Sequence, residues 1–444
     1  MKEDKTDSVK ADYLPEDHDF LTYVKKVFRH RCRQAGFRRI TTALIEKVED
    51  CTPHYADETI LKNKGCIVEC LEGGQKGIFK FDPVFSVSRA YVKNNMKDMP
   101  QPVELYQIEK YINKDESGEM NERMEFGLSV LGADDPALDA QIIYLASKIL
   151  DDLGLKEHYT LQINYIGSEE SRSLYIEDLK NFYFDKQRSM PEDALRHYEE
   201  GDFLQLLRNE DEDMQILAQL APKLEHYLTE ADQERYKVFK EYLDELEVSY
   251  NENKAIFGGG NFNANTVFEF WHNDKGSKNC IMYGGSNDEI IEKLGGEKTN
   301  YVGLSSDVEM MIGNMKDAGI RVPHKDDIQV FVAQLGKNAK KKALSLLERI
   351  REAGIHSVGA MGTGSMRAQL DMATSFNVKY ALLMGEVEVK DGMVIVRDMS
   401  IGTQESVPYN KAIEMMIERV GKEKVDVMTD AEKSQDLKDS KKKK

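Results

Sequence analysis

The stretch from residue 328 to residue 421 alternates between short apolar runs and longer amphipathic runs, and this alternation restricts the fold more than any other feature of the chain. The apolar runs are IQVFVAQLG (328–336), SVGAMG (357–362), YALLMGE (380–386) and MVIVRDMS (393–400). Helical periodicity marks 338–354, 365–377 and 409–421. Strands that alternate with helices predict a compact α/β domain, which we place at residues 323–422, followed by a disordered tail at 423–444.

The chain before Pro323 carries the alternation of antiparallel strands. The strand-like runs are GCIVECLE (65–72), KGIFKFD (76–82), PVELYQIEKYI (102–112) and MEFGLSVLG (124–132). The charged stretch 113–123 is predicted to be a turn. Amphipathic helices are predicted at 20–36, 83–95 and 136–153, and residues 168–250 predict an inserted helical subdomain. We therefore expect a flexible lead at residues 1–15 and an α+β domain at residues 16–322.

Charge is distributed unevenly along the 444 residues. The net charge is −18, and residues 1–325 carry −20 while residues 326–444 carry +2. An acidic body repels nucleic acid at long range, so the C-terminal domain is the better candidate for RNA binding. Solubility alone is the alternative explanation of the acidity. The RNA-binding candidates are Lys337, Lys340, Lys341, Lys342 and Arg367, for which a solvated helix face is the alternative.

Neither a membrane span nor a metal site is predicted. No run approaches 18 apolar residues, and the start of the chain lacks the apolar segment of a secretory signal. The five cysteines are odd in number, which favours reduced thiols and a cytoplasmic location. Cys66 and Cys70 lie four residues apart, and we find no further ligands at zinc spacing.

The triplet Gly258-Gly259-Gly260 raises the question of a phosphate-binding loop. A P-loop needs a Lys-Ser or Lys-Thr pair and a helix after the glycines, and neither follows here. The triplet by itself therefore predicts no nucleotide site.

A series of short strings resembles histidyl-tRNA synthetase, a class II aminoacyl-tRNA synthetase, in one colinear order over residues 13–422. They are DYLPED, PQPVELYQIEKYI, DAQIIYLASKIL, INYIGSEESRSLYIEDL, LQLLRNEDEDMQILAQLAPKLEHYL, NTVFEF, YGGSNDEIIEKLGG, YVGLSSDVEMM and MGEVEVKDGMVIVRDMSIGTQESV. The resemblance implies a class II antiparallel sheet flanked by helices, a helical insert and an anticodon-binding domain.

The same resemblance implies that catalytic arginines are missing. Arginine suits the phosphates of ATP because its guanidinium is a rigid, permanently charged fork. The family's arginine positions in motif 2, in the histidine-site loop, in its Gly-Gly-Arg segment and in motif 3 align with Asn113, Gly258, Ser286 and Met310. We therefore expect no catalytic residues here and no use of ATP or magnesium.

The acid that holds the substrate's amino group in the family aligns with Asp82. We predict a remnant of the ligand pocket formed by Asp82, Lys80, Glu269, Asp288 and Glu309. Such a pocket is acidic, so it disfavours ATP and suits a cation or a small amine.

Three functions follow from these observations. The first is a degenerate synthetase-like protein, a homodimer joined through segment 37–49, that binds tRNA, other RNA or a protein partner in a regulatory role. The second is an allosteric subunit of an ATP phosphoribosyltransferase in histidine biosynthesis. The third is a divergent but active histidine--tRNA ligase.

Overall fold

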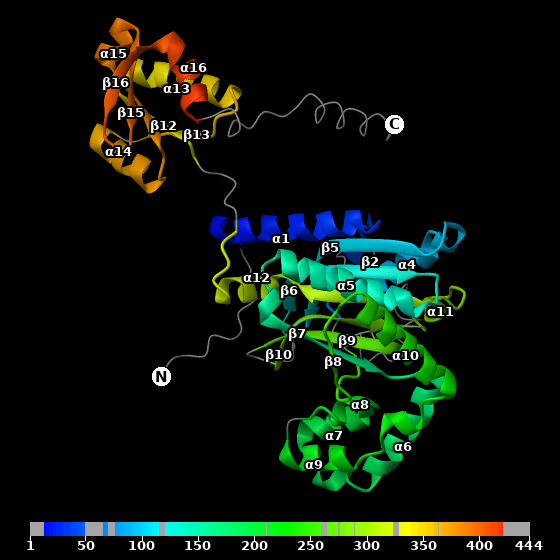
Figure 1. Ribbon diagram of the computed structural model, residues 1–444. Coiled ribbons are helices and arrows are strands. Elements are labelled where there is room, and N and C mark those ends of the chain that lie inside the picture. Colours follow the sequence, from blue (N-terminus) through cyan, green and yellow to red (C-terminus); the bar gives the residue numbers. More distant parts are fainter. Residues whose placement is uncertain are drawn as a thin grey trace. The chain divides into compact units, whose positions relative to one another are not determined.

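The computed structural model divides the chain into two compact units, Met1–Pro323 and His324–Lys444 (Figure 1). It describes residues 13–48, 65–69, 76–114, 120–209, 211–258, 264–273, 276–287, 289–322, 328–362 and 364–420. No helix in these ranges is long and apolar enough to cross a membrane.

An eight-stranded sheet forms the centre of the first unit, in the order β1-β5-β6-β11-β10-β9-β7-β8. Its strands are β1 (Arg38–Arg39), β5 (Val103–Lys114), β6 (Met120–Leu131), β7 (Tyr159–Tyr165), β8 (Asn251–Glu252), β9 (Ala264–His272), β10 (Gly276–Ser286) and β11 (Tyr301–Asp307). The pairing is antiparallel except where the short edge strands β1 and β8 lie parallel to their neighbours. A small sheet of β2 (Ile45–Lys47), β4 (Lys76–Phe79) and β3 (Ile67–Glu69) stands apart.

The predicted turn at residues 113–123 is wrong in its extent. β5 runs to Lys114 and β6 starts at Met120, so Asn113 pairs with Asn121 and Tyr111 pairs with Arg123. Charged residues extend these strands because each strand places every second side chain on an exposed face.

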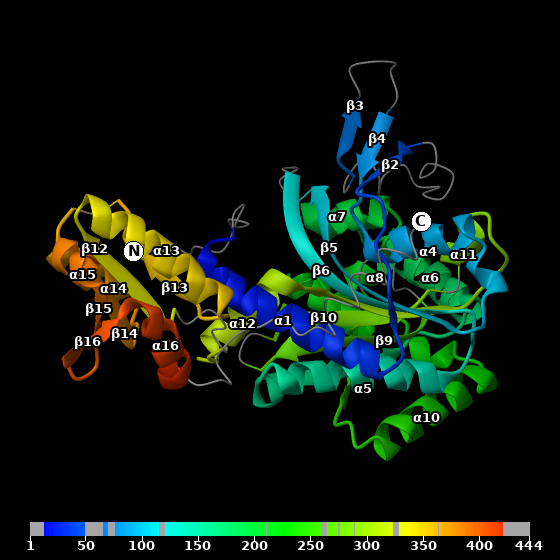
Figure 2. The same cartoon turned by 90° about the horizontal axis from the view of Figure 1, so that it is seen from above.

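Four helices cover one face of the large sheet, which we call the helix face: α1 (Pro15–Gln34), α5 (Pro136–Asp152), α10 (Glu230–Glu245) and α12 (Val308–Asp317). Figure 2 shows α1, α5 and α10 along one side of the sheet. The core there is dense, since the rings of Phe28 on α1 and Phe126 on β6 stack with centroids 3.9 Å apart. Proline at the first turn starts α1 and α5, and Asp135 caps α5 by accepting from the Ala137 amide at 2.9 Å. Elsewhere lie α4 (Pro83–Lys93) and α11 (Ile290–Lys293).

The predicted insert at residues 168–250 is helical, but its last helix joins the main core. α6 (Glu169–Phe184), α7 (Glu192–Glu199), α8 (Phe203–Leu206) and α9 (Glu212–Leu220) share an apolar cluster of their own. α10 instead buries Phe239 and Leu243 in the core beneath the sheet. Short 3-10 turns connect several elements: η1 (Met96–Asp98), η2 (Lys156–His158), η3 (Gln187–Ser189), η4 (Leu224–His226) and η5 (Tyr409–Lys411).

The second unit is the α/β domain that the alternation predicts. Its sheet has the order β13-β12-β14-β15-β16, with β12 (Val330–Leu335), β13 (Ser357–Gly359) and β14 (Tyr380–Gly385) parallel, and β15 (Met393–Asp398) and β16 (Gln404–Pro408) antiparallel. α13 (Lys337–Glu352) and α16 (Ala412–Val420) pack on one face, and α14 (Met366–Ser375) packs on the other. α15 (Glu386–Asp391) and β16 were not predicted.

Candidate functional site

One line of polar side chains crosses the uncovered face of the large sheet, which we call the polar face. Cross-strand pairing aligns Gln107, Gly127, Ser305, Tyr283, Glu269 and Gln162 on six successive strands. Side chains directly opposite each other point to the same side of a sheet. Gly127 leaves space for the Gln107 side chain, because a β-carbon at position 127 would lie only 3.0 Å from Gln107 Nε2. Neither amide atom of the buried Gln107 has a hydrogen-bond partner among the described residues.

A row of carboxylates lies beside this line, formed by Glu109 on β5, Glu125 on β6 and Asp307 on β11. Like charges directly opposite each other are unfavourable, so at least one of these groups should hold its proton. Burial raises the pKa of Glu125 to about 8, and the hydrogen bond from Ser305 at 2.9 Å only partly offsets it. Burial therefore favours the protonated form of Glu125.

Two cations pair with carboxylates of this row. Lys80, itself buried, pairs with Glu109 and lies over the Tyr111 ring at 4.9 Å from its centroid. Arg123 lies 3.8 Å from Asp307. The predicted acid Asp82 caps α4 by accepting from the Phe85 amide at 2.7 Å.

The helical insert docks on the far end of the polar face. Arg208, which follows α8, places its guanidinium 3.2 Å from the Glu269 carboxylate. Trp271 donates its indole N–H to the same carboxylate at 2.6 Å. Glu269 is only 3% exposed, so this contact closes the face at β9.

Several predicted residues lie away from the polar face. Ser286 is on the helix face, where its hydroxyl donates to Asp139 of α5 at 3.2 Å. Glu309 lies in the first turn of α12, and burial raises its pKa to about 6. It accepts from the Met124 amide and from the Tyr13 hydroxyl, so these contacts place it apart from the polar line.

The remaining predicted positions have few contacts that bear on a site. Met310 lies in the first turn of α12 and is 37% exposed. Asn113 lies near the end of β5, and Gly258 has a positive φ of 81°. Asp288, Gly259 and Gly260 lie outside the described residues. The polar face therefore brings together Asp82, Lys80 and Glu269 of the predicted set.

Sequence reasoning missed Gln107, Tyr111, Arg123, Glu125 and Tyr283. The signal was present in PVELYQIEKYI, where every second residue from Leu105 onward lies on the polar face. Lys80, Arg123 and Arg208 each lie against a carboxylate of this face, which lowers its net negative charge.

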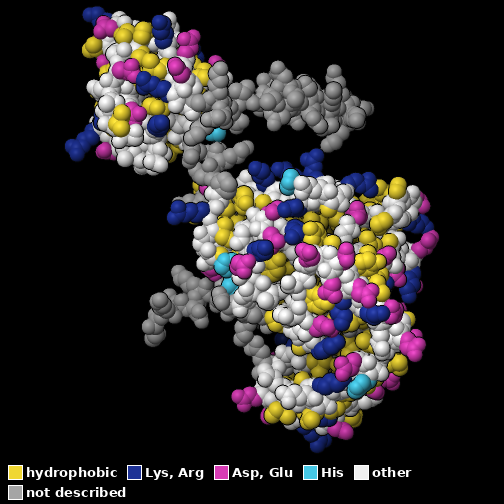
Figure 3. Space-filling view, viewed as in Figure 1, with side chains coloured by type: hydrophobic (Ala, Val, Ile, Leu, Met, Phe, Trp, Pro, Cys, Tyr) yellow, Lys and Arg dark blue, Asp and Glu magenta, His cyan; other side chains and the backbone are white. Residues whose placement is uncertain are grey.

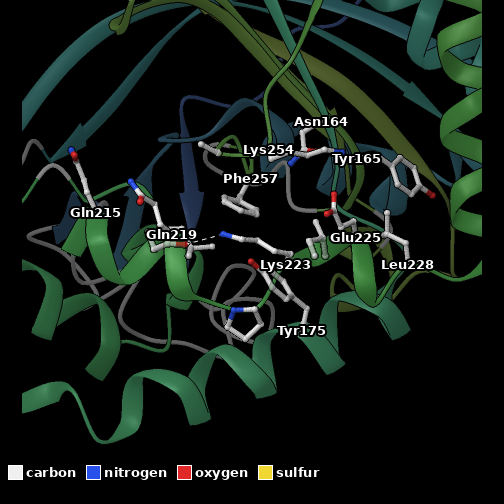
Figure 4. Close-up of a pocket in the computed structure, with 15 residues that line it drawn as sticks. Asn164, Tyr165, Tyr175, Gln215, Gln219, Lys223, Glu225, Leu228, Lys254 and Phe257 are labelled. Carbon is white, nitrogen blue, oxygen red and sulfur yellow. Dashed lines mark hydrogen bonds between the residues drawn. The ribbon is translucent and has the colours of Figure 1, made fainter. Parts of the chain in front are cut away.

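A cavity of about 360 Å³ lies where the insert meets β7. Figure 4 shows the Phe257 ring above the chain of Lys223, whose ammonium donates to the Ala218 carbonyl at 3.2 Å. The rings of Tyr175 and Phe257 stack with centroids 6.5 Å apart. None of the predicted site residues lines this cavity.

The RNA-binding candidates lie at one edge of the second unit. Lys337, Lys340, Lys341 and Lys342 are exposed on the first turns of α13, and the exposed Arg367 is on the first turn of α14. Both helices follow parallel strands, so their N-termini meet at the carboxyl edge of the sheet. Cations at a helix N-terminus oppose the helix dipole, and an anion there would relieve this.

No group of three or more metal-ligating side chains occurs within the described ranges.

Replacing Glu125 with Gln should remove a pH dependence of folding. The carboxyl group binds its proton more tightly in the folded chain, so its contribution to the free energy of unfolding falls as pH rises from about 4.5 to about 8. Urea unfolding is measured at pH 5, 6.5 and 8. The free energy of unfolding of Glu125→Gln, relative to that of the native chain, should rise by up to ~1.4 kcal/mol per pH unit. Glu122→Gln, an exposed position on the same strand, is the control. A parallel pH dependence of the native chain and Glu125→Gln would contradict this assignment.

Comparison with known proteins supports the order of these elements. The family model described as "Anticodon binding domain" matches residues 329–419. The chain is 29% identical over 404 residues to the histidine--tRNA ligase of Dehalococcoides mccartyi, covering 90% of this chain and 96% of the relative. It is 28% identical over 414 residues to that of Thermotoga maritima, covering 93% and 98%.

Solved structures share the fold. The apo histidyl-tRNA synthetase of S. aureus has a TM-score of 0.74 at 22% identity, covering 93% of this chain and 99% of that chain. A protein of Bacillus halodurans described as an ATP phosphoribosyltransferase regulatory subunit/histidyl-tRNA synthetase has a TM-score of 0.62 at 16% identity, covering 86% and 98%.

Proposed function

Because this chain is a histidyl-tRNA synthetase-like protein of class II, with the predicted α+β core and anticodon-binding domain, we propose that it is a catalytically degenerate relative that binds tRNA in a regulatory role. The observation that most strongly supports this proposal is the pairing of cations with carboxylates on the polar face. Lys80, Arg123 and Arg208 each face a carboxylate. Binding the triphosphate of ATP needs cations that are free to contact it.

The polar face keeps the features that suit an amine. Glu109, Asp307 and Glu269 are paired with cations, so the amide of Gln107 is the group left to bind an amine. Its two amide atoms have no hydrogen-bond partner among the described residues and offer both a donor and an acceptor. The proposed pocket therefore senses a small amine, such as an amino acid, and does not activate it with ATP.

RNA binding is assigned to the second unit. The charges of Lys337, Lys340 and Lys341 have no ion-pair partner within residues 328–362 and 364–420. The proposal also includes a homodimer joined through segment 37–49 and a cytoplasmic location, which the free thiols of Cys32, Cys66 and Cys280 favour.

Neutralising the α13 lysines should weaken tRNA binding. Filter binding of tRNA to Lys337→Gln/Lys340→Gln/Lys341→Gln should show at least a roughly tenfold lower affinity at low salt, with a salt slope smaller by about 2. The control is Lys390→Gln/Lys411→Gln, which removes exposed lysines elsewhere in the same unit. Equal affinities of the two variants would refute the assignment to α13. If the native chain shows no saturable binding at low salt, the tRNA proposal itself fails.

The second candidate is a regulatory subunit of an ATP phosphoribosyltransferase. Its support is the fold shared with the B. halodurans protein. The anticodon-binding domain favours the first candidate, because a purely allosteric subunit has no need of it. Co-purification with a phosphoribosyltransferase chain would favour the second.

A further inference from the structure

Three basic side chains converge on one cavity at the edge of the large sheet. Lys25 and Arg29 are four residues apart on α1, so they lie on the same side of the helix. Arg39 on β1 pairs in register with Tyr106 on β5. These three side chains, with Tyr106 and Ile108, line a cavity of about 260 Å³. In Figure 3, Lys and Arg side chains line the upper edge of the larger unit, where α1 lies in Figure 1.

The charges of this cluster are not balanced by the protein. Lys25, Arg29 and Arg39 form no ion pair with any residue that the structure describes. Burial lowers the pKa of Lys25, and repulsion from Arg39 and Lys110 lowers it further. The charge of Glu309 raises the pKa of Lys25. This carboxylate, however, already accepts hydrogen bonds from the Tyr13 hydroxyl and from the Met124 amide.

The neighbouring cations differ from the cluster in this respect. Arg31, on the same helix, holds Asp152 through two hydrogen bonds of 2.6 and 2.7 Å. Lys110, on β5, holds Glu122. The unit that contains them carries a net charge of −20 over residues 1–325, so carboxylates are abundant. The absence of one beside Lys25, Arg29 and Arg39 in the described structure leaves room for an external anion.

We propose that Lys25, Arg29 and Arg39 form a phosphate-binding site. Two guanidinium forks and an ammonium supply more donors and more charge than a single carboxylate uses, and they match a group with three acceptor oxygens. The phosphate is a backbone group of RNA or a free anion of the pyrophosphate type. The RNA source rests on the proposed tRNA binding, whereas the free anion does not.

The test uses two double variants of the full chain with equal loss of charge. Arg29→Gln/Arg39→Gln removes one cavity-lining arginine from α1 and one from β1. Arg33→Gln/Arg38→Gln removes one arginine from each of the same elements. All four arginines are exposed, but Arg33 and Arg38 do not line the cavity. Calorimetry with inorganic pyrophosphate at low salt should show at least a roughly tenfold weaker affinity for the cavity variant and an unchanged affinity for the control.

Filter binding of tRNA to the same variants separates the sources. If the cavity variant loses affinity for pyrophosphate alone, the site binds a free anion. A further loss of tRNA affinity, with a salt slope smaller by about 2, assigns an RNA contact. If the native chain binds no tRNA, the proposed function fails and the pyrophosphate result still decides the site.

Two results would overturn the site. One is equal binding by the cavity variant and its control with both probes. The other is a shift of the cavity variant toward monomer in sedimentation with unchanged pyrophosphate affinity, since Arg39 lies in segment 37–49 and would then serve the proposed dimer instead of an anion. Circular dichroism of both variants checks that the fold is unchanged.

Discussion

ATP–pyrophosphate exchange with histidine should run at least about 10³-fold more slowly with this chain than with a histidine--tRNA ligase assayed in parallel. Each lost phosphate contact removes about 2–4 kcal/mol of transition-state binding, and two losses are enough for this factor. The resemblance aligns the family's four arginine positions with Asn113, Gly258, Ser286 and Met310. The structure supplies no replacement at Ser286, whose side chain is on the helix face.

The histidine--tRNA ligase of Thermotoga maritima is a suitable positive control, because it aligns with 93% of this chain. The one arginine on the polar face of β6, Arg123, is the obvious source of residual activity. Exchange within tenfold of the control enzyme would contradict the proposal, and its loss in Arg123→Gln would then identify that arginine as the compensating group.

Replacing Asp232 with Ala should cost about 3–5 kcal/mol of unfolding free energy, because it leaves several buried donors without an acceptor. The Asp232 carboxylate is 4% exposed and lies at the start of α10. It accepts from the Ser168 amide at 3.0 Å, from the Ser171 hydroxyl at 2.5 Å and from the Thr229 amide and hydroxyl at 3.1 and 2.9 Å. The Asp232 carboxylate thus connects the first residues of the insert, Ser168 and Ser171, to Thr229 at its end.

Urea unfolding followed by circular dichroism measures this change. Glu234→Ala is the matched control, because Glu234 is exposed on the same helix and its one ion pair with a described residue is to Lys237, at 3.6 Å. A surface pair of this kind contributes at most about 1 kcal/mol. A loss at Asp232 no larger than that of the control would show that the insert holds its position without this carboxylate.

The sequence predicted the second unit well and missed its smallest pieces. Buried apolar runs and long periodic helices such as α13 are strong signals. α15 lies in EVEVKDG, whose alternation favours a strand. Its helical form depends on the Glu388 side chain, which accepts from the Gly385 amide at 2.8 Å, and on Gly392 with a φ of 68°. These two end caps favour the helix more than the alternation of EVEVKDG favours a strand.

The candidate site was only partly predictable for a different reason. The resemblance identified Asp82 and Glu269, but the polar line depends on register between strands far apart in the chain. Ser305 pairs with Gly127 and also with Tyr283, and the pairing of β9 with β10 shifts at three irregularities. A shift of one residue would turn each side chain to the other face, so no local pattern could place this line.

Trp271 is the only tryptophan in the chain. Its indole contacts Glu269 and packs against the apolar cluster of the insert, so its surroundings change when the insert moves on the sheet. The protein therefore contains a built-in optical reporter at the boundary between insert and polar face. Ligand titrations can be followed by its emission without any label. When the excitation wavelength is one that the 20 tyrosines do not absorb, the emission comes from that one boundary.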